Sequence, residues 1–144
     1  MIVPYEEIQD AVTRITEFSP PTPLIKSEYF SRKLNTNIYF KLEMLNPTHS
    51  FKTRGASNAI LSLSDEQRQN GVITASGGNH GLGVAYVAAK LGIPAHVYLP
   101  ENTPPSKVQS FEEYGTHITL VGSVWDEANQ AALARAEADD IAYI

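Results

Sequence analysis

The residues best suited to chemistry lie in a glycine-rich stretch and around one lysine. Residues 76–83 have the sequence SGGNHGLG and follow a short apolar run at residues 72–75. Glycines let the backbone approach a ligand closely, and the N–H groups at a helix N-terminus attract anions. The spacing matches neither the dinucleotide-binding fingerprint nor a phosphate loop, which needs Lys followed by Ser or Thr. The stretch therefore predicts either a tight strand–helix turn or a site for a carboxylate or phosphate.

Lys52, within the sequence SFKTRGA at residues 50–56, is the second candidate. A positive charge at the start of a helix is unfavourable in the field of the helix dipole. That field, with partial burial between Phe51 and the apolar helix that follows, favours the neutral amine that Schiff-base chemistry needs. The alternatives are an ordinary solvated lysine, and for Arg54 a surface charge or an ion-pair partner.

Composition limits the other possibilities. The chain has 144 residues, of which 42% are hydrophobic and 19% charged, as in a soluble globular domain of ordinary size. The absence of cysteine excludes disulfides, thiolate zinc sites and a cysteine nucleophile. No two histidines have metal-ligand spacing, so no metal site is predicted. A net charge of −5 with scattered basic residues argues against nucleic acid as a partner.

No window of the chain approaches the ~20 apolar residues of a membrane span, so no membrane partner is expected. The first ten residues include three acids and no basic residue, which is wrong for a secretory signal or a transit peptide. A cytoplasmic location is the default expectation.

Regular elements fill the second half of the chain. Four apolar runs begin at residues 72, 95, 118 and 141, and helical patterns over residues 82–89, 106–114 and 126–138 lie between them. Alternating strands and helices predict an α/β fold: an open, twisted parallel sheet with flanking helices and right-handed crossovers. Ligand sites in such sheets lie outside the carboxyl ends of the strands. The loop after residue 75 occupies such a place.

The first half is less regular. We expect a helix over residues 2–18, ended by prolines, a strand over 38–43, and a helix over 56–63. Ser64 and Gln67 have the spacing of a capping box for a short further helix. Glu43 is interpreted as a structural or solvent-exposed carboxylate, and Trp125 as a packing residue.

The two candidate motifs together resemble a known family. SFKTRGA around Lys52, followed by SGGNHG at residues 76–81, resembles the threonine/serine dehydratase branch of the fold-type II pyridoxal-phosphate enzymes, which also contains serine racemases. Further landmarks occur in the family's order: TPL at 22–24, KLE at 41–43, LGIPA at 91–95 and PPSK at 104–107. The resemblance covers almost the whole chain from Thr22 onward, and it implies pyridoxal 5'-phosphate as the cofactor.

The resemblance also implies roles for individual residues. Lys52 matches the lysine that holds the cofactor covalently and later removes the substrate α-proton. Phe51 matches a residue that packs near the cofactor ring, and Asn79 one that hydrogen-bonds the cofactor's phenolic oxygen. The carboxylate of a small amino-acid substrate is expected to bind, largely through backbone N–H groups, at Ser76, Gly77, Gly78, Asn79 and His80.

The reaction that the resemblance implies is β-elimination from serine or threonine, giving a 2-oxo acid and ammonia. His80 stands where the cysteine-synthase branch commonly has threonine, which favours the dehydratases and racemases. Gly77 stands where racemases carry a second serine. Because glycine has no side chain to deliver a proton, serine racemase is the less favoured alternative.

The resemblance further divides the chain. Residues 1–50 are expected to be an N-terminal segment of the larger domain of such an enzyme, and residues 51–144 its smaller α/β domain. The C-terminal half of the family enzyme, with its phosphate-binding glycine loop, is expected to be absent, so the site is incomplete and cofactor retention weak.

Two other hypotheses remain open. One is a non-catalytic α/β module that binds an anion. The other is a structural or regulatory fragment that pairs with the missing half or with a second copy to complete its sheet, because residues 141–144 would otherwise be an unpaired terminal strand.

Overall fold

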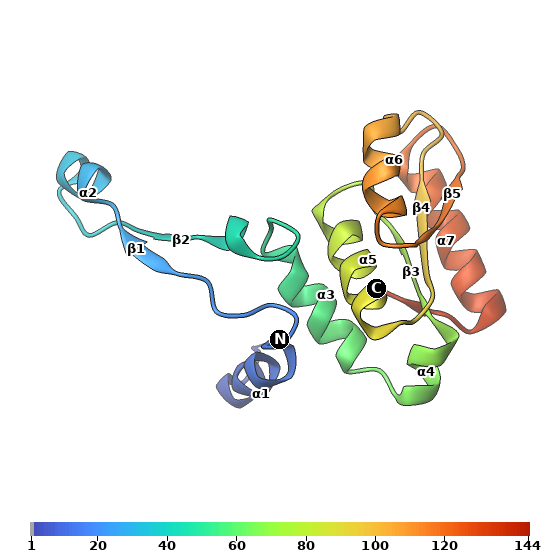
Figure 1. Ribbon diagram of the computed structural model, residues 1–144, viewed down its shortest axis with the longest axis horizontal. Coiled ribbons are helices and arrows are strands. Elements are labelled where there is room, and N and C mark those ends of the chain that lie inside the picture. Colours follow the sequence, from blue (N-terminus) through green and yellow to red (C-terminus); the bar gives the residue numbers. More distant parts are fainter. Residues whose placement is uncertain (1) are drawn as a thin grey trace.

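The computed structural model describes residues 2–144, which form an α/β unit and an N-terminal arm that projects from it (Figure 1). The arm contains helix α2 (Glu28–Leu34) and the antiparallel strands β1 (Leu24–Lys26) and β2 (Tyr39–Lys41). Helix α1 (Tyr5–Ile15) precedes it, and the 3-10 turn η1 (Glu43–Leu45) leads from it to helix α3 (Lys52–Leu61). In this described range no helix has the length and apolar character needed to cross a membrane.

The α/β unit is built on a parallel sheet of four strands, in the order β5-β4-β3-β6. The strands are β3 (Val72–Ala75), β4 (Ala95–Leu99), β5 (His117–Leu120) and β6 (Ala142–Tyr143). The helices are α4 (Asp65–Asn70), α5 (Asn79–Leu91), α6 (Pro105–Glu112) and α7 (Trp125–Asp139). The α/β fold with a parallel sheet and flanking helices is confirmed, and so is the capping box at Ser64, which begins α4.

Side chains that alternate along the strands are buried under helices on the two faces of the sheet. Val72 packs with residues of α3 and α5, and Val97 with residues of α5 and α6. Ile73 and Tyr98 lie in a separate cluster with the alanines of α7. Because both faces are covered, β3 is buried along its whole length.

The structure corrects the expected strand at residues 38–43. Only Tyr39–Lys41 forms a strand, and its partner β1 was not predicted. All six paired residues are exposed, so no burial alternation marks this ribbon in the sequence. The predicted helix at 56–63 in fact begins four residues earlier, at Lys52.

The C-terminal strand is also different from the prediction of an unpaired end. Ala142 and Tyr143 pair in parallel with Val72 and Ile73 of β3. Ile141, just before them, is buried at 9% exposure. The hypothesis of a fragment that must pair with another chain therefore loses its basis, because the strand that it took to be unpaired is paired with β3.

Candidate functional site

Lys52 is the first residue of α3, and Phe51 is the residue before the helix. The Lys52 backbone N–H donates to Ser50 Oγ at 3.2 Å, which fixes the backbone at this point. The Lys52 Nζ lies 5.5 Å from the centre of the Phe51 ring. Both side chains are exposed, Phe51 at 60%. The predicted partial burial of Lys52 is therefore wrong: its side chain projects into solvent.

The glycine-rich stretch joins β3 to α5 at the carboxyl edge of the sheet. Gly78 is the residue before α5. No side chain forms a capping hydrogen bond at the N-terminus of this helix, and its first turn contains no acidic residue. A Cβ at Gly78 would meet nothing within 4 Å, so the space beside it is open. The first N–H groups of α5 therefore face an accessible region, as an anion site requires.

Helix packing brings Lys52 next to this loop. A Cβ at Gly83, in the second turn of α5, would lie 3.3 Å from the Lys52 carbonyl oxygen and 3.3 Å from Ala56 Cβ. The two helices thus touch through a glycine, and a larger residue would separate them. The structure places the two sequence motifs side by side through this contact.

A second glycine shapes the loop itself. A Cβ at Gly81 would lie 2.2 Å from the Ser76 carbonyl oxygen and 2.9 Å from the ring of Phe111, which is fully buried. The close turn from Ser76 into α5 therefore requires glycine at position 81. The sequence presents Gly81 and Gly83 as part of the motif but does not indicate which contact each permits.

A polar network fastens the N-terminus of α3 to the preceding segments. Arg54 Nε and Nη2 donate to the two carboxylate oxygens of Glu43 at 2.8 Å and 3.0 Å. Thr22 Oγ1 donates to Glu43 Oε1 at 2.6 Å and Asn46 Nδ2 to Oε2 at 2.7 Å. The hydrogen bond from Arg54 is the largest cause that lowers the pKa of Glu43, which falls from 4.5 to about 2 although burial opposes the shift. Glu43 is thus a structural carboxylate, paired and ionised.

The other loop residues have separate surroundings. Asn79 is exposed as the first residue of α5. His80 Nε2 lies 3.0 Å from the Ile144 carbonyl oxygen, which also accepts from Thr74 Oγ1 at 2.9 Å. The His80 ring is therefore directed to the end of β6.

The prediction that Trp125 is a packing residue is wrong, because about half of its side chain is exposed. Its indole Nε1 donates to the carbonyl oxygen of Ala75, the last residue of β3, at 2.7 Å, while the side chain is 52% exposed. The indole forms part of a pocket of about 330 Å³ next to the glycine loop. The pocket is lined by Gly77, Gly78, Pro100, Asn102, Thr103, Pro104, Lys107 and Trp125.

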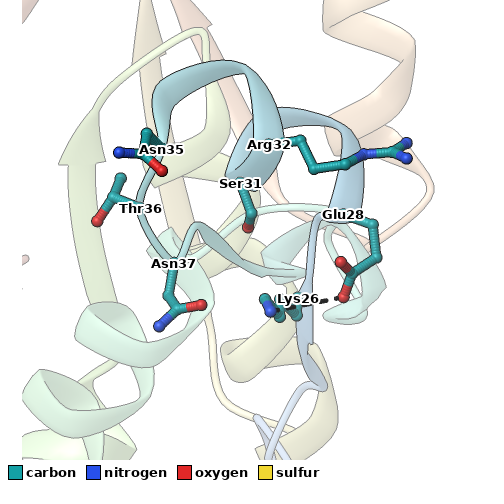
Figure 2. A pocket seen from close by; sticks show the side chains of 7 residues that line it. All are labelled: Lys26, Glu28, Ser31, Arg32, Asn35, Thr36 and Asn37. Carbon is teal, nitrogen blue, oxygen red and sulfur yellow. Dashed lines mark ion pairs between the residues drawn. The ribbon is translucent and has the colours of Figure 1, made fainter.

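A second pocket, of about 390 Å³, lies on the arm around α2. Figure 2 shows its lining, where Lys26 and Glu28 form an ion pair at 3.7 Å. None of the predicted site residues lines it, and α2 lies at the end of the arm away from the sheet (Figure 1). Within residues 2–144 no group of three His, Asp or Glu side chains is arranged to hold a metal ion.

An exposed lysine beside an open glycine loop at the carboxyl edge of a parallel sheet defines an α/β protein with a candidate anion site and a nearby amine. The profile of the family described as "Pyridoxal-phosphate dependent enzyme" matches residues 15–144, and the chain belongs to this family. Its members' cofactor, pyridoxal phosphate, agrees with the expectation from the sequence.

Individual relatives narrow the similarity to one branch. The chain is 46% identical over 136 residues to an L-threonine ammonia-lyase of Geobacter sulfurreducens, covering 94% of this chain and 34% of that protein. The structure of maize serine racemase superposes with a TM-score of 0.89 at 35% identity, over 96% of this chain and 42% of that one. The processed form of threonine deaminase isoform 2 from Solanum lycopersicum gives 0.88 at 35% identity, over 99% and 40%. The predicted resemblance to the threonine/serine dehydratase branch is confirmed, and the chain spans about a third of its curated relative.

Proposed function

We propose that this chain provides the lysine and the carboxylate-binding loop of a pyridoxal-phosphate-dependent lyase that acts on serine or threonine. The observation that carries the proposal is the contact of α3 with α5 at Gly83, because it sets Lys52 beside the glycine loop. The similarity to an L-threonine ammonia-lyase supports the choice of reaction and substrate class.

The residues present fit the cofactor's chemistry. Lys52 offers an exposed primary amine that forms no ion pair with any described residue. Phe51 and Asn79 are exposed nearby, and the space beside Gly78 is open. Lys52 would hold the cofactor covalently, Asn79 would donate a hydrogen bond to its phenolic oxygen, and Phe51 would pack near its ring.

When bound, pyridoxal phosphate supplies an electron sink for the charge that develops at the substrate α-carbon. Backbone N–H groups of residues 76–80 bind the substrate carboxylate and so orient the bond from the α-carbon to its hydrogen. The Lys52 Nζ, as a neutral amine, accepts the α-proton. Lys52 would return this proton to the β-hydroxyl, which would leave as water, and hydrolysis of the carbon–nitrogen bond would then give a 2-oxo acid and ammonia.

Elimination is favoured over racemisation within this proposal. A racemase must return a proton to the opposite face of the α-carbon. Gly77 has no side chain to do so, whereas Lys52 serves one face. The similarity to maize serine racemase leaves racemisation as the alternative reaction of the same site.

The proposal also covers the domains of the chain, the rest of the site and the location of the protein. Residues 1–50 belong to a larger domain and residues 51–144 to a smaller one. The anchor for the cofactor phosphate comes from polypeptide corresponding to the unmatched part of the relatives. The arm's exposed apolar side chains support such a partner surface, among them Leu24, Tyr29, Tyr39 and Phe40. The proposed location is the cytoplasm.

The test is a labelling experiment. The purified chain is mixed with pyridoxal phosphate, its visible spectrum is recorded, and borohydride reduction is followed by mass mapping of the modified lysines. We expect a visible band and a label on Lys52 that is lost in Lys52→Ala, with Lys90→Gln as the control at another exposed lysine.

Label spread evenly over all the lysines would contradict the proposal for this chain. An anion-binding module without catalysis would then be the better description, if carboxylate binding survives in Lys52→Ala.

A further inference from the structure

The pocket beside the glycine loop lies outside the carboxyl ends of three neighbouring strands. Gly77 and Gly78 follow β3, Asn102 and Pro104 follow β4, and Trp125 follows β5. This is the place where open parallel sheets bind ligands. Its volume of about 330 Å³ is within the range of small-molecule pockets, roughly 300–1,000 Å³.

One wall of the pocket is a fixed aromatic ring. The Trp125 indole is held by its hydrogen bond to Ala75, a residue only 4% exposed at the end of a buried strand. About half of the Trp125 side chain nevertheless remains open to solvent. An indole whose N–H is satisfied and whose body is exposed offers apolar contact area that is already ordered.

Lys107, on α6, is the only charged residue that lines the pocket. It forms no ion pair with any described residue. Of the nearby acids, Glu127 accepts hydrogen bonds from the Ser123 backbone N–H at 2.6 Å and from Ser123 Oγ at 3.2 Å, so its carboxylate is engaged outside the lining. Lys107 therefore supplies the charge of the lining itself, while the exposed acids Glu101 and Asp126 flank lining residues without belonging to the lining.

We infer that this pocket completes the substrate site: Lys107 supplies the counter-charge for the amino acid's carboxylate, and Trp125 is the wall against which its carbon skeleton packs. The inference rests on the proposed function for the kind of ligand. It adds a side-chain cation and an aromatic surface to a loop that otherwise binds through backbone N–H groups. It also makes Trp125, the chain's single tryptophan, a reporter of occupancy.

Fluorescence of Trp125 in the cofactor-free chain tests the inference. The probes are n-butyrate and L-threonine, which carry the carboxylate, and n-butylamine, which lacks it, all at constant ionic strength. We expect a saturable change with both carboxylates and none with n-butylamine. Lys107→Gln should weaken Kd about fivefold to tenfold, since it removes a charge-assisted contact at a partly exposed position. Lys107→Arg should restore most of the affinity.

Lys33→Gln is the matched control, because it removes the same charge from α2 on the arm, where Lys33 lies 5.8 Å from the Tyr29 ring. Its Kd should stay within about twofold of the wild-type value. Equal weakening in Lys33→Gln and Lys107→Gln, unchanged binding in Lys107→Gln, or no saturable change with n-butyrate in the wild-type chain would each overturn the inference.

Lys52→Arg separates this inference from the proposed function, because arginine keeps the positive charge beside the glycine loop but cannot hold the cofactor covalently. The variant should bind n-butyrate as the wild type does, since the charge is kept and the assay contains no cofactor. Failure of the proposed function appears instead in the labelling of Lys52. The n-butyrate binding test and the Lys52 labelling test can therefore fail independently of each other.

Discussion

Substituting alanine for Gly81 tests whether the loop geometry depends on that one missing side chain. The new Cβ would lie 2.2 Å from the Ser76 carbonyl oxygen and 2.9 Å from the Phe111 ring. Over-packing in a core typically costs about 1–3 kcal/mol, and a backbone oxygen next to a fully buried ring places Gly81→Ala near the upper end. Alanine recovers at most ~1 kcal/mol through its helix propensity. The net loss in the free energy of unfolding should be about 2 kcal/mol.

Gly55→Ala is the matched control within α3. A Cβ at Gly55 would meet nothing within 4 Å, so only the helix-propensity gain of about 0.5–1 kcal/mol remains. Urea denaturation followed by far-UV circular dichroism should therefore separate the two variants by about 3 kcal/mol. Binding of n-butyrate to the pocket should weaken in Gly81→Ala, because Ser76 must move, and stay unchanged in Gly55→Ala. Equal stability of the two variants would refute the argument and mean that the loop relaxes freely.

Three other substitutions test separate parts of the fold. Glu43→Gln should lose about 1–3 kcal/mol in the free energy of unfolding at neutral pH, since the pKa of Glu43 is about 2 in the fold against 4.5 ordinarily. The ionised carboxylate stabilises the fold above pH 4.5. The difference between the variant and the wild type in urea denaturation should therefore vanish as the pH falls toward 2. Burial, and after it the nearby charge of His117, lowers the pKa of His96 below 6.5, so the unfolded chain binds a proton at His96 more readily than the folded chain does. The fold therefore loses stability as the pH falls below 6.5, and His96→Gln should reduce this loss. An unchanged dependence of stability on pH in the variant would count against the lowered pKa of His96. Ser64→Ala should cost about 1 kcal/mol, because Ser64 Oγ accepts the Gln67 backbone N–H at 3.1 Å, and a loss below about 0.3 kcal/mol in urea denaturation would show that the capping box contributes little.

The elements that the sequence predicts well are those whose burial is local and periodic. The sequence predicts β3 and β4 at the residues where they occur, because each is a short, mainly apolar run covered on both faces. β1 was missed because its three residues are all exposed and only its pairing with β2 makes it a strand. The predicted strand at 38–43 is too long for the same reason: only Tyr39–Lys41 pair with β1, and no burial pattern marks these limits in the sequence.

The parts of the site that the sequence does not give depend on contacts between distant residues. The role of Trp125 follows from a hydrogen bond to Ala75, fifty positions earlier in the chain. The exposure of Lys52 is likewise visible only in the folded chain, since the apolar residues beside it in the sequence predict partial burial. Sequence motifs therefore indicate the candidate residues of the site, while the surroundings of those residues depend on the packed fold.

The position of Lys52 is nevertheless as well defined as that of a buried residue. Its carbonyl group touches α5 at Gly83, its N–H is held by Ser50, and Arg54, two residues further on, is tied to Glu43. The backbone is thus fixed on three sides while the side chain remains in solvent. A lysine that must hold a cofactor covalently and also move a proton needs both properties, because the amine has to reach two positions from one anchored point. The fold supplies the anchor through helix packing, so substitutions that separate α3 from α5 should impair the site even when they leave Lys52 itself untouched.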